Sequence, residues 1–111
     1  MPIRPVMEMV KDAKSKITRL NVAEARARAD AGKALLVDIR DIRELQRDGR
    51  VPGAFHAPRG MLEFWIDPAS PYHKEALAID GQLILFCAAA ARSSLSALTL
   101  QQMGVANVAE M

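Results

Sequence analysis

A thiol and a guanidinium lie close together in one short stretch of the sequence. Cys87, the only cysteine in the chain, directly follows the apolar run Leu83–Phe86, and Arg92 stands five residues further on. A short apolar run after a turn is typical of a buried parallel strand. The stretch therefore predicts a strand, a tight loop and a helix, with Cys87 at the carboxyl end of the strand. Open α/β sheets bind their ligands at that edge.

This arrangement predicts a nucleophile beside an anion-binding loop. Backbone N–H groups at the start of a helix have no intrahelical partners, so a loop that curls into a helix turns several donors inward. These donors and the helix dipole favour negative charge, which stabilises the thiolate form of Cys87. A thiolate at a helix start is a nucleophile. The alternative interpretation is structural, because a lone cysteine is often a small buried hydrophobe.

Three motifs, in the same order, resemble those of the rhodanese family of sulfurtransferases. The Cys-x4-Arg-Ser sequence of residues 87–93 is similar to the family's active-site loop. Leu36–Arg40 followed by Glu44 is similar to the first motif, and Arg50–Pro58 to the second. The resemblance extends over most of the chain and implies that Cys87 is the catalytic nucleophile. It also implies a substrate cradle made by Ala88, Ala89, Ala90, Ala91, Arg92 and Ser93.

The resemblance further implies a set of supporting residues. The aspartate of the family's first motif supports the catalytic loop, so Asp38 is expected to hydrogen-bond backbone N–H groups or Arg92. Arg40 is expected to pair with Glu44 across one helical turn. These residues would shape the site without taking part in the chemistry. In related domains the region after the second motif forms a wall above the loop, which places two residues at the substrate mouth, Arg59 and Trp65.

Two positions depart from the family's pattern. Arg50 stands where the family usually has a histidine, and Ala90 stands where it often has a glycine. If position 90 needs a positive φ, an alanine there costs roughly 1 kcal/mol or more. His56 has the right chemistry for an acid–base group. However, the family commonly places a polar structural residue at that position, which favours a structural role.

The chain is expected to form one α/β domain of the rhodanese-like type, with a mainly parallel sheet of about five strands flanked by helices on both faces. Residues 17–111 would make up this domain. Two capping-box patterns mark helix starts inside it, Asn21 with Glu24 and Asp41 with Glu44. The family's usual final helix has no counterpart in the sequence. One face of the sheet is therefore expected to lack cover unless the N-terminal helix or a second chain supplies it.

Residues 1–16 precede the family resemblance and are expected to form an amphipathic helix packed on the domain. Apolar side chains recur there at helical spacing, namely Val6, Met9, Val10, Ala13 and Ile17. A membrane-bound or partner-bound helix is the alternative interpretation.

The predicted reaction moves a sulfane sulfur from an anionic or persulfide donor to a thiophilic acceptor through a persulfide on Cys87. Two other functions are kept as alternatives. One is a weakly active or inactive rhodanese-like module that binds or senses sulfide. The other is a cysteine phosphatase, whose loop has five residues between cysteine and arginine, whereas this chain has four. The shorter loop favours sulfur over phosphate.

Composition narrows the remaining classes. The chain has 111 residues and a formal net charge of +2, which gives no reason to expect nucleic-acid or membrane binding. One cysteine and two histidines do not make a metal-ligand set, so neither a metal nor a cofactor is expected. A single cysteine fits a reducing, cytoplasmic setting. The expected partners are a small sulfur donor and a thiol acceptor, and a homodimer is left open.

Overall fold

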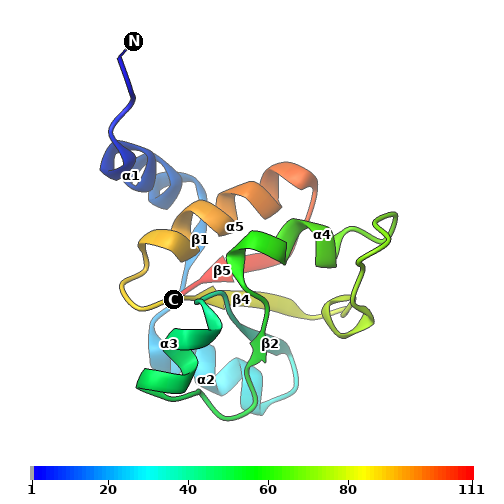
Figure 1. Cartoon of the computed structure of the whole chain (residues 1–111). Coiled ribbons are helices and arrows are strands. Elements are labelled where there is room, and N and C mark those ends of the chain that lie inside the picture. The colour runs from blue at the N-terminus through cyan, green and yellow to red at the C-terminus, as the bar shows by residue number, and fades with distance from the viewer. Residues whose placement is uncertain (1) are drawn as a thin grey trace.

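The structure, a computed structural model, describes residues 2–111. Helices and strands alternate along most of the chain (Figure 1). In chain order the elements are α1 (Val6–Lys16), β1 (Thr18–Arg19), α2 (Val22–Asp30), β2 (Ala34–Asp38), α3 (Ile42–Asp48), β3 (Phe55–His56), η1 (Arg59–Met61), α4 (Leu62–Ile66), η2 (Glu75–Leu77), β4 (Gln82–Phe86), α5 (Ala91–Met103) and β5 (Val108–Glu110).

The strands form one five-stranded sheet in the order β1-β5-β4-β2-β3, and every pair of neighbours is parallel. The prediction of a mainly parallel α/β sheet is therefore confirmed. All five residues of β4 are buried, which explains why the last four, Leu83–Phe86, are all apolar. Because parallel strands share one direction, their carboxyl ends meet at the same edge of the sheet. Asp38, His56 and Glu110 end their strands at that edge, and Cys87 follows β4 there.

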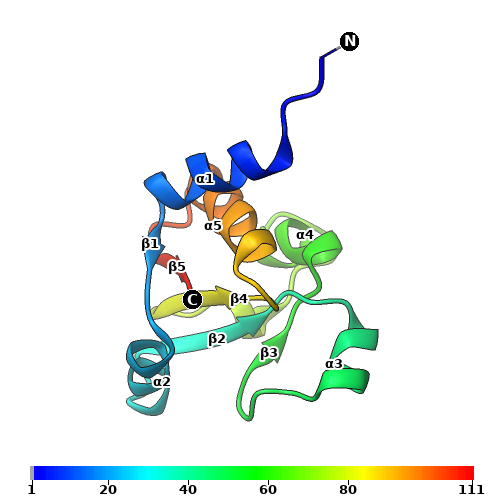
Figure 2. The ribbon, with the colours of Figure 1, turned by 90° about the vertical axis from the view of Figure 1, so that its left-hand side faces the viewer.

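Helices cover both faces of the sheet, with α1, α4 and α5 on one side and α2 and α3 on the other (Figures 1 and 2). The side chains of β4 alternate between the two cores. Leu83 and Leu85 pack in the core under α5, whereas Ile84 and Phe86 pack in a smaller core on the α2 side. The expectation of an uncovered sheet face is therefore wrong for residues 2–111, because the alanine-rich face of α2 approaches the sheet closely and covers it.

Capping explains where the helices that frame the site begin. Asn21 and Glu24 form a capping box at the start of α2, and Asp41 and Glu44 form one at the start of α3. Both predicted patterns are confirmed. The helix after Cys87 ends at Gly104, whose left-handed backbone is the usual way to stop a helix.

The N-terminal helix α1 packs on α5, on the side of α5 that faces away from the sheet (Figure 2). Val10 and Ala13 are buried in this contact. Val6 and Met9 were expected on the same face, but they are 58% and 41% exposed. Only the later turns of α1 reach α5, so the helical spacing identified the helix correctly and its buried face in part.

Candidate active site

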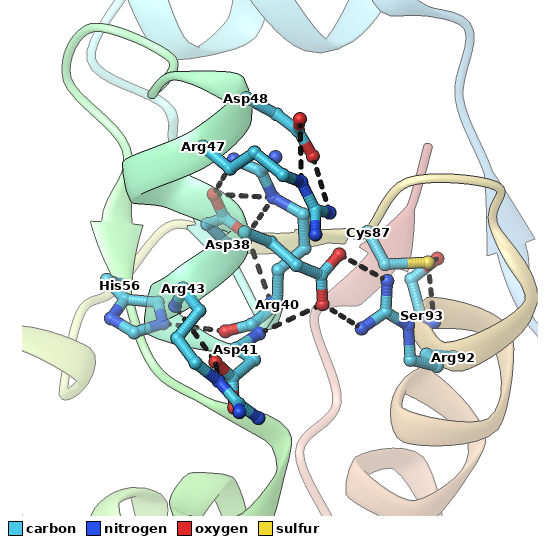
Figure 3. A network of polar contacts seen from close by, with 11 residues as sticks. Asp38, Arg40, Asp41, Arg43, Arg47, Asp48, His56, Cys87, Arg92 and Ser93 are labelled. Atoms are coloured by element: carbon cyan, nitrogen blue, oxygen red, sulfur yellow. Dashed lines mark hydrogen bonds and ion pairs between the residues drawn. The ribbon is translucent and has the colours of Figure 1, made fainter.

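Cys87 lies where the chain leaves β4 and turns into α5 (Figure 3). Its sulfur accepts a hydrogen bond from the backbone N–H of Ser93 at 3.4 Å and lies 3.5 Å from the Ser93 hydroxyl oxygen. The backbone N–H groups of Ala89 and Arg92 also donate toward the sulfur. The side chain of Cys87 is only partly buried. Three amides therefore converge on a sulfur atom that a small molecule can reach.

The surroundings of Cys87 favour its thiolate. Burial alone raises the pKa of the thiol, because a charge is less stable away from water. Hydrogen bonds from the Ser93 hydroxyl and from the N–H groups of Ser93, Ala89 and Arg92 act in the opposite direction. Their combined effect is larger, so the pKa of Cys87 lies below its ordinary value. A larger share of the sulfur is therefore in its nucleophilic form near neutral pH.

Ala90 gives the loop its shape. Its φ of 62° and ψ of 8° lie in the left-handed region, and it is the single non-glycine residue with a positive φ in the part of the chain that the structure describes. The carbonyl of Ala90 accepts a hydrogen bond from the Ser94 hydroxyl in the first turn of α5. The left-handed turn lets the chain curl before α5 begins, so that the amides on either side face Cys87.

Arg92 is held by Glu44 of α3. Two guanidinium nitrogens donate to the two carboxylate oxygens, at 2.6 and 2.9 Å, which makes a bidentate pair. The same carboxylate accepts from the backbone N–H of Asp41 and completes the capping box of α3. The hydrogen bonds from Arg92 are the main reason why the pKa of Glu44 is lowered to about 2. One carboxylate thus ties α3 to the loop that carries Cys87.

Asp38 forms a separate ion pair with Arg40. The Arg40 guanidinium donates to both Asp38 oxygens, with a shortest distance of 2.7 Å, and the Arg40 N–H donates to Oδ1 at 3.0 Å. This hydrogen bonding raises the pKa of Arg40 despite its burial. Arg40 also donates to the carbonyl of Gly49 at 2.9 Å. The pair therefore fixes the end of β2 to the end of α3.

The two arginines exchange the partners that the sequence suggested. Asp38 was expected to hydrogen-bond backbone N–H groups or Arg92, and it does accept from a backbone N–H, that of Arg40. Arg92 pairs with Glu44 instead of Asp38, and Arg40, expected to pair with Glu44, pairs with Asp38. The chain turns sharply after β2, which brings Arg40 back onto the carboxylate two residues before it. Glu44, in the first turn of α3, is then left to meet the start of α5.

His56 has a structural contact at the same sheet edge. Its Nε2 lies 2.7 Å from the backbone carbonyl of Arg40. Because a carbonyl can only accept, Nε2 carries the hydrogen in this contact. The ring therefore holds the turn after β2 in place (Figure 3), which agrees with the structural role favoured for it.

The hollow beside Cys87 is lined by the loop after α3 and not by the residues expected at the mouth. Its volume is about 360 Å³, and its lining residues are Arg40, Asp48, Gly49, Arg50, Val51, Phe86, Cys87 and Ala88. Arg59 is exposed in η1 and lines no part of this hollow. Trp65 packs against the core with its ring edge-on to Phe55 at 6.3 Å between centroids. Its large apolar ring gains more from that contact than from a solvent-facing wall.

A larger, mainly apolar cavity of about 710 Å³ lies at the opposite edge of the sheet. Gly81, Leu83 and Asn107 line it, and these residues stand at the amino ends of β4 and β5. Cys87 lies at the carboxyl end of β4, so this cavity is separated from the thiol by the length of the strand.

Glu110 is a site residue that the sequence did not predict. It is fully buried at the end of β5, and one of its oxygens accepts from the Ser93 hydroxyl at 3.1 Å. The signal in the sequence is a single acidic residue in an otherwise apolar C-terminal run. Such a residue in a parallel strand needs a partner, but the spacing alone does not say which one.

Within residues 2–111, no group of three or more His, Cys, Asp or Glu side chains is placed to hold a metal ion. None of the helices in that range combines the length and the hydropathy needed to cross a membrane.

Residues 21–111 match the model of the rhodanese-like domain. A protein of unknown function from Rhodopseudomonas palustris, a possible tyrosine phosphatase, is 45% identical, with a TM-score of 0.90 over 99% of this chain and 87% of its own. The polysulfide-sulfur transferase homodimer of Wolinella succinogenes is 28% identical, with a TM-score of 0.65 over 93% of this chain and 73% of its own.

A human single-domain sulfurtransferase shares the fold, at 21% identity and a TM-score of 0.66, over 83% of this chain and 86% of its own. The search among curated proteins found no match. The family model covers most of the chain, including all three motifs and the loop that surrounds Cys87. The chain therefore belongs to the rhodanese-like domain family.

Proposed function

We propose that the chain is a sulfurtransferase that carries a sulfane sulfur on Cys87 as a persulfide. The observation that carries this proposal is the convergence of the N–H groups of Ala89, Arg92 and Ser93 on the Cys87 sulfur. Such donors stabilise the thiolate before the reaction and the charged terminal sulfur of the persulfide during it. Membership of the family and the likeness to a polysulfide-sulfur transferase support the same class of reaction.

The reaction consists of two displacements at sulfur. In the first, the Cys87 thiolate attacks the outer sulfur of a donor such as thiosulfate. A sulfur–sulfur bond forms at Cys87, the bond inside the donor breaks, and sulfite leaves with the electron pair. In the second, an acceptor thiolate or cyanide attacks the outer sulfur of the persulfide. Cys87 then leaves as a thiolate and is ready for another cycle.

The charges around the loop favour an anionic donor that enters through the hollow. The guanidinium groups of Arg92 and Arg40 are each paired with a carboxylate. Arg50 lines the hollow and makes no ion pair with any of residues 2–111. Ala88 and Ala89 present only methyl groups and are exposed. The site therefore suits a thin anion, such as thiosulfate, a polysulfide or a low-molecular-weight persulfide, with Arg50 near its charged end.

A cysteine phosphatase is the second candidate, because the relative from Rhodopseudomonas palustris is a possible tyrosine phosphatase. The spacing argues against it. Four residues separate Cys87 from Arg92, whereas cysteine phosphatases place five there. A shorter loop closes a smaller ring of amides, which fits one terminal sulfur better than a tetrahedral phosphate. A binding or sulfide-sensing module without turnover is the third candidate.

One experiment separates the three. The purified protein and Cys87→Ser are incubated with thiosulfate, weighed intact by mass spectrometry and then given cyanide. The sulfurtransferase gains one sulfur atom and releases thiocyanate, whereas Cys87→Ser does neither. A protein that gains sulfur but does not transfer it is a sensing module. Equal thiocyanate from both proteins, or turnover of a chromogenic phosphate ester by the wild type alone, would refute the proposal.

The proposed chemistry also suggests a compartment. A thiolate that must persist between turnovers needs a reducing environment, because oxidants convert low-pKa cysteines to sulfenic acids and disulfides. We therefore propose a cytoplasmic location, and fractionation of cells that express the tagged full chain would test it.

A further inference from the structure

Glu110 is a fully buried carboxylate that the proposed reaction leaves unused. Its Oε2 lies 3.1 Å from the hydroxyl of Ser93, and its Oε1 lies 3.4 Å from the hydroxyl of Ser94. Oε1 also lies 3.5 Å from Nε of Arg19, whose side chain is half exposed on β1. A buried carboxylate is costly unless donors satisfy its charge. Glu110 is therefore tied to the first turn of α5, directly behind Cys87.

Each hydroxyl hydrogen that could be donated to Glu110 also faces a second acceptor. A serine hydroxyl has one hydrogen to donate. The hydroxyl of Ser93 faces both Glu110 and the sulfur of Cys87, and the hydroxyl of Ser94 faces both Glu110 and the carbonyl of Ala90. When Cys87 is a thiol, it donates to Ser93, and Ser93 donates to Glu110. When Cys87 is a thiolate, the sulfur and the carboxylate compete for the same hydrogen.

We propose that Cys87, Ser93 and Glu110 form a proton relay in which Glu110 sets the protonation state of the nucleophile through Ser93. The thiol proton passes to the Ser93 oxygen as the Ser93 proton passes to Oε2 of Glu110. The two hydrogen bonds reverse direction, and a thiol beside a carboxylate becomes a thiolate beside a carboxylic acid. One negative charge moves from β5 to the sulfur, and no other reactant is needed. Glu110 is a positioning residue, because it acts through Ser93.

The other groups that face the relay can be named. Arg19 on β1 is the single charged side chain in contact with Glu110 among residues 2–111. On β4, Leu85 stands in register with Glu110 and is apolar. At the sulfur end, the charge nearby is Arg92, which is already paired with Glu44 of α3. No carboxylate other than Glu110 contacts Ser93 within the described chain. The relay thus has one exit for the proton.

Glu110→Gln is the sharpest test, because glutamine keeps the shape of the side chain. Arg19 and Ser94 face Oε1, which favours the amide oxygen at that position and places the amide NH2 against the Ser93 oxygen. The variant then imitates the protonated glutamate permanently, and the hydrogen of Ser93 is free for the thiolate. The structure has one cysteine, so alkylation by iodoacetamide reports Cys87 alone. Alkylation rates are measured across pH by intact mass.

In Glu110→Gln the apparent pKa of Cys87 should fall by about one unit, so alkylation below that pKa becomes roughly tenfold faster, as one released charge-assisted hydrogen bond allows. A residue that only supported packing would leave the pKa unchanged or raise it by loosening the loop. Ser93→Ala removes the link. In the Ser93→Ala background, the Glu110→Gln shift should shrink to a small fraction of its size.

An equal pKa shift in both backgrounds would mean that the charge of Glu110 acts on Cys87 without Ser93, which would overturn the relay. A Glu110→Gln protein that is as stable as the wild type and has an unchanged Cys87 pKa would also overturn it. If Glu110→Gln does not fold, the wild type still decides. Coupled sites titrate in two steps, so wild-type alkylation should show two steps across pH and Ser93→Ala should show one. A single step in the wild type would overturn the relay.

The inference rests on the proposed function only in taking the Cys87 thiolate as the nucleophile. Alkylation needs no sulfur donor, so it reads the relay by itself. A protein with the predicted pKa shifts that gains no sulfur from thiosulfate would refute the sulfurtransferase and leave the relay standing. A protein that gains sulfur but lacks the pKa shifts would refute the relay and leave the sulfurtransferase standing.

Discussion

Replacing Ala90 by glycine should stabilise the protein, although it removes a methyl group. The alanine has a φ of 62°, and a left-handed backbone costs an L-residue roughly 1–2 kcal/mol. Glycine relieves that cost but loses about 0.5–1 kcal/mol more conformational entropy on folding. The net gain in the free energy of unfolding is therefore about 0.5 kcal/mol.

Ala89→Gly is the matched control. It lies in the same loop, is exposed, and has no positive φ, so it loses the entropy without relieving any strain. The difference between Ala90→Gly and Ala89→Gly isolates the backbone term and should be about 1–2 kcal/mol. In a domain of this size each 1 kcal/mol shifts Tm by about 4–8 °C. Circular dichroism during heating and in urea measures both quantities.

The reasoning is refuted if both variants unfold at the same midpoint, or if Ala90→Gly is the less stable of the two. Either result would mean that position 90 does not hold a strained left-handed turn in solution. The comparison needs cooperative unfolding in both variants, which coincident transitions by two probes would establish.

Three further substitutions should affect different quantities: stability, the rate of persulfide formation and KM. Gly81→Ala should destabilise the fold by about 1–3 kcal/mol, because its Cβ would lie 2.6 Å from the carbonyl oxygen of Lys33. Glu44→Gln should slow persulfide formation roughly tenfold by loosening the loop at Arg92. Because the hydrogen bonds from Arg92 lower the pKa of Glu44 from 4.5 to about 2, its stabilising contribution is complete above pH 4.5. It is lost as the pH falls toward 2, so the variant and the wild type should converge in stability there. Arg50→Ala should raise KM for thiosulfate roughly tenfold with kcat little changed, an effect that added salt weakens.

Each of these has a control in the same molecule. Gly60→Ala introduces a Cβ that meets nothing within 4 Å and should cost little. Glu24→Gln makes the same change at the equivalent capping residue of α2, which does not contact Arg92, and should leave persulfide formation unchanged. Arg59→Ala removes an exposed arginine outside the hollow and should leave KM unchanged. If a control matches its partner variant in the measured quantity, the contact assigned to that variant is wrong.

Local patterns carried the correct part of the sequence-based prediction. The apolar run before Cys87 predicted β4, and the two capping boxes predicted where α2 and α3 begin, because these features depend on residues a few positions apart. The left-handed turn at Ala90 was raised as a possibility only by the family resemblance, from the glycine that related domains often have there.

The incorrect part depended on contacts between distant segments. The partner of Arg92 lies 48 residues away, and the first motif offers two acidic residues, Asp38 and Glu44, that could have reached it. The direction in which α3 leaves β2 determines that Glu44, and not Asp38, pairs with Arg92. Trp65 was expected at the mouth, but the core offered its ring a better contact with Phe55. Glu110 was missed because β5 enters the sheet between β1 and β4, which its short sequence does not reveal.

The place of β5 in the sheet has a consequence for the order in which the protein can be made. Strand β1 leaves the ribosome early, yet its neighbour in the sheet is β5, and Thr18 pairs with Ala109. The first four strands to be synthesised therefore leave a slot in the sheet that only the last one can fill. Until β5 is synthesised, β1 has no neighbouring strand to pair with, and its backbone N–H and C=O groups stay unpaired. The nascent chain is therefore a natural client for chaperones.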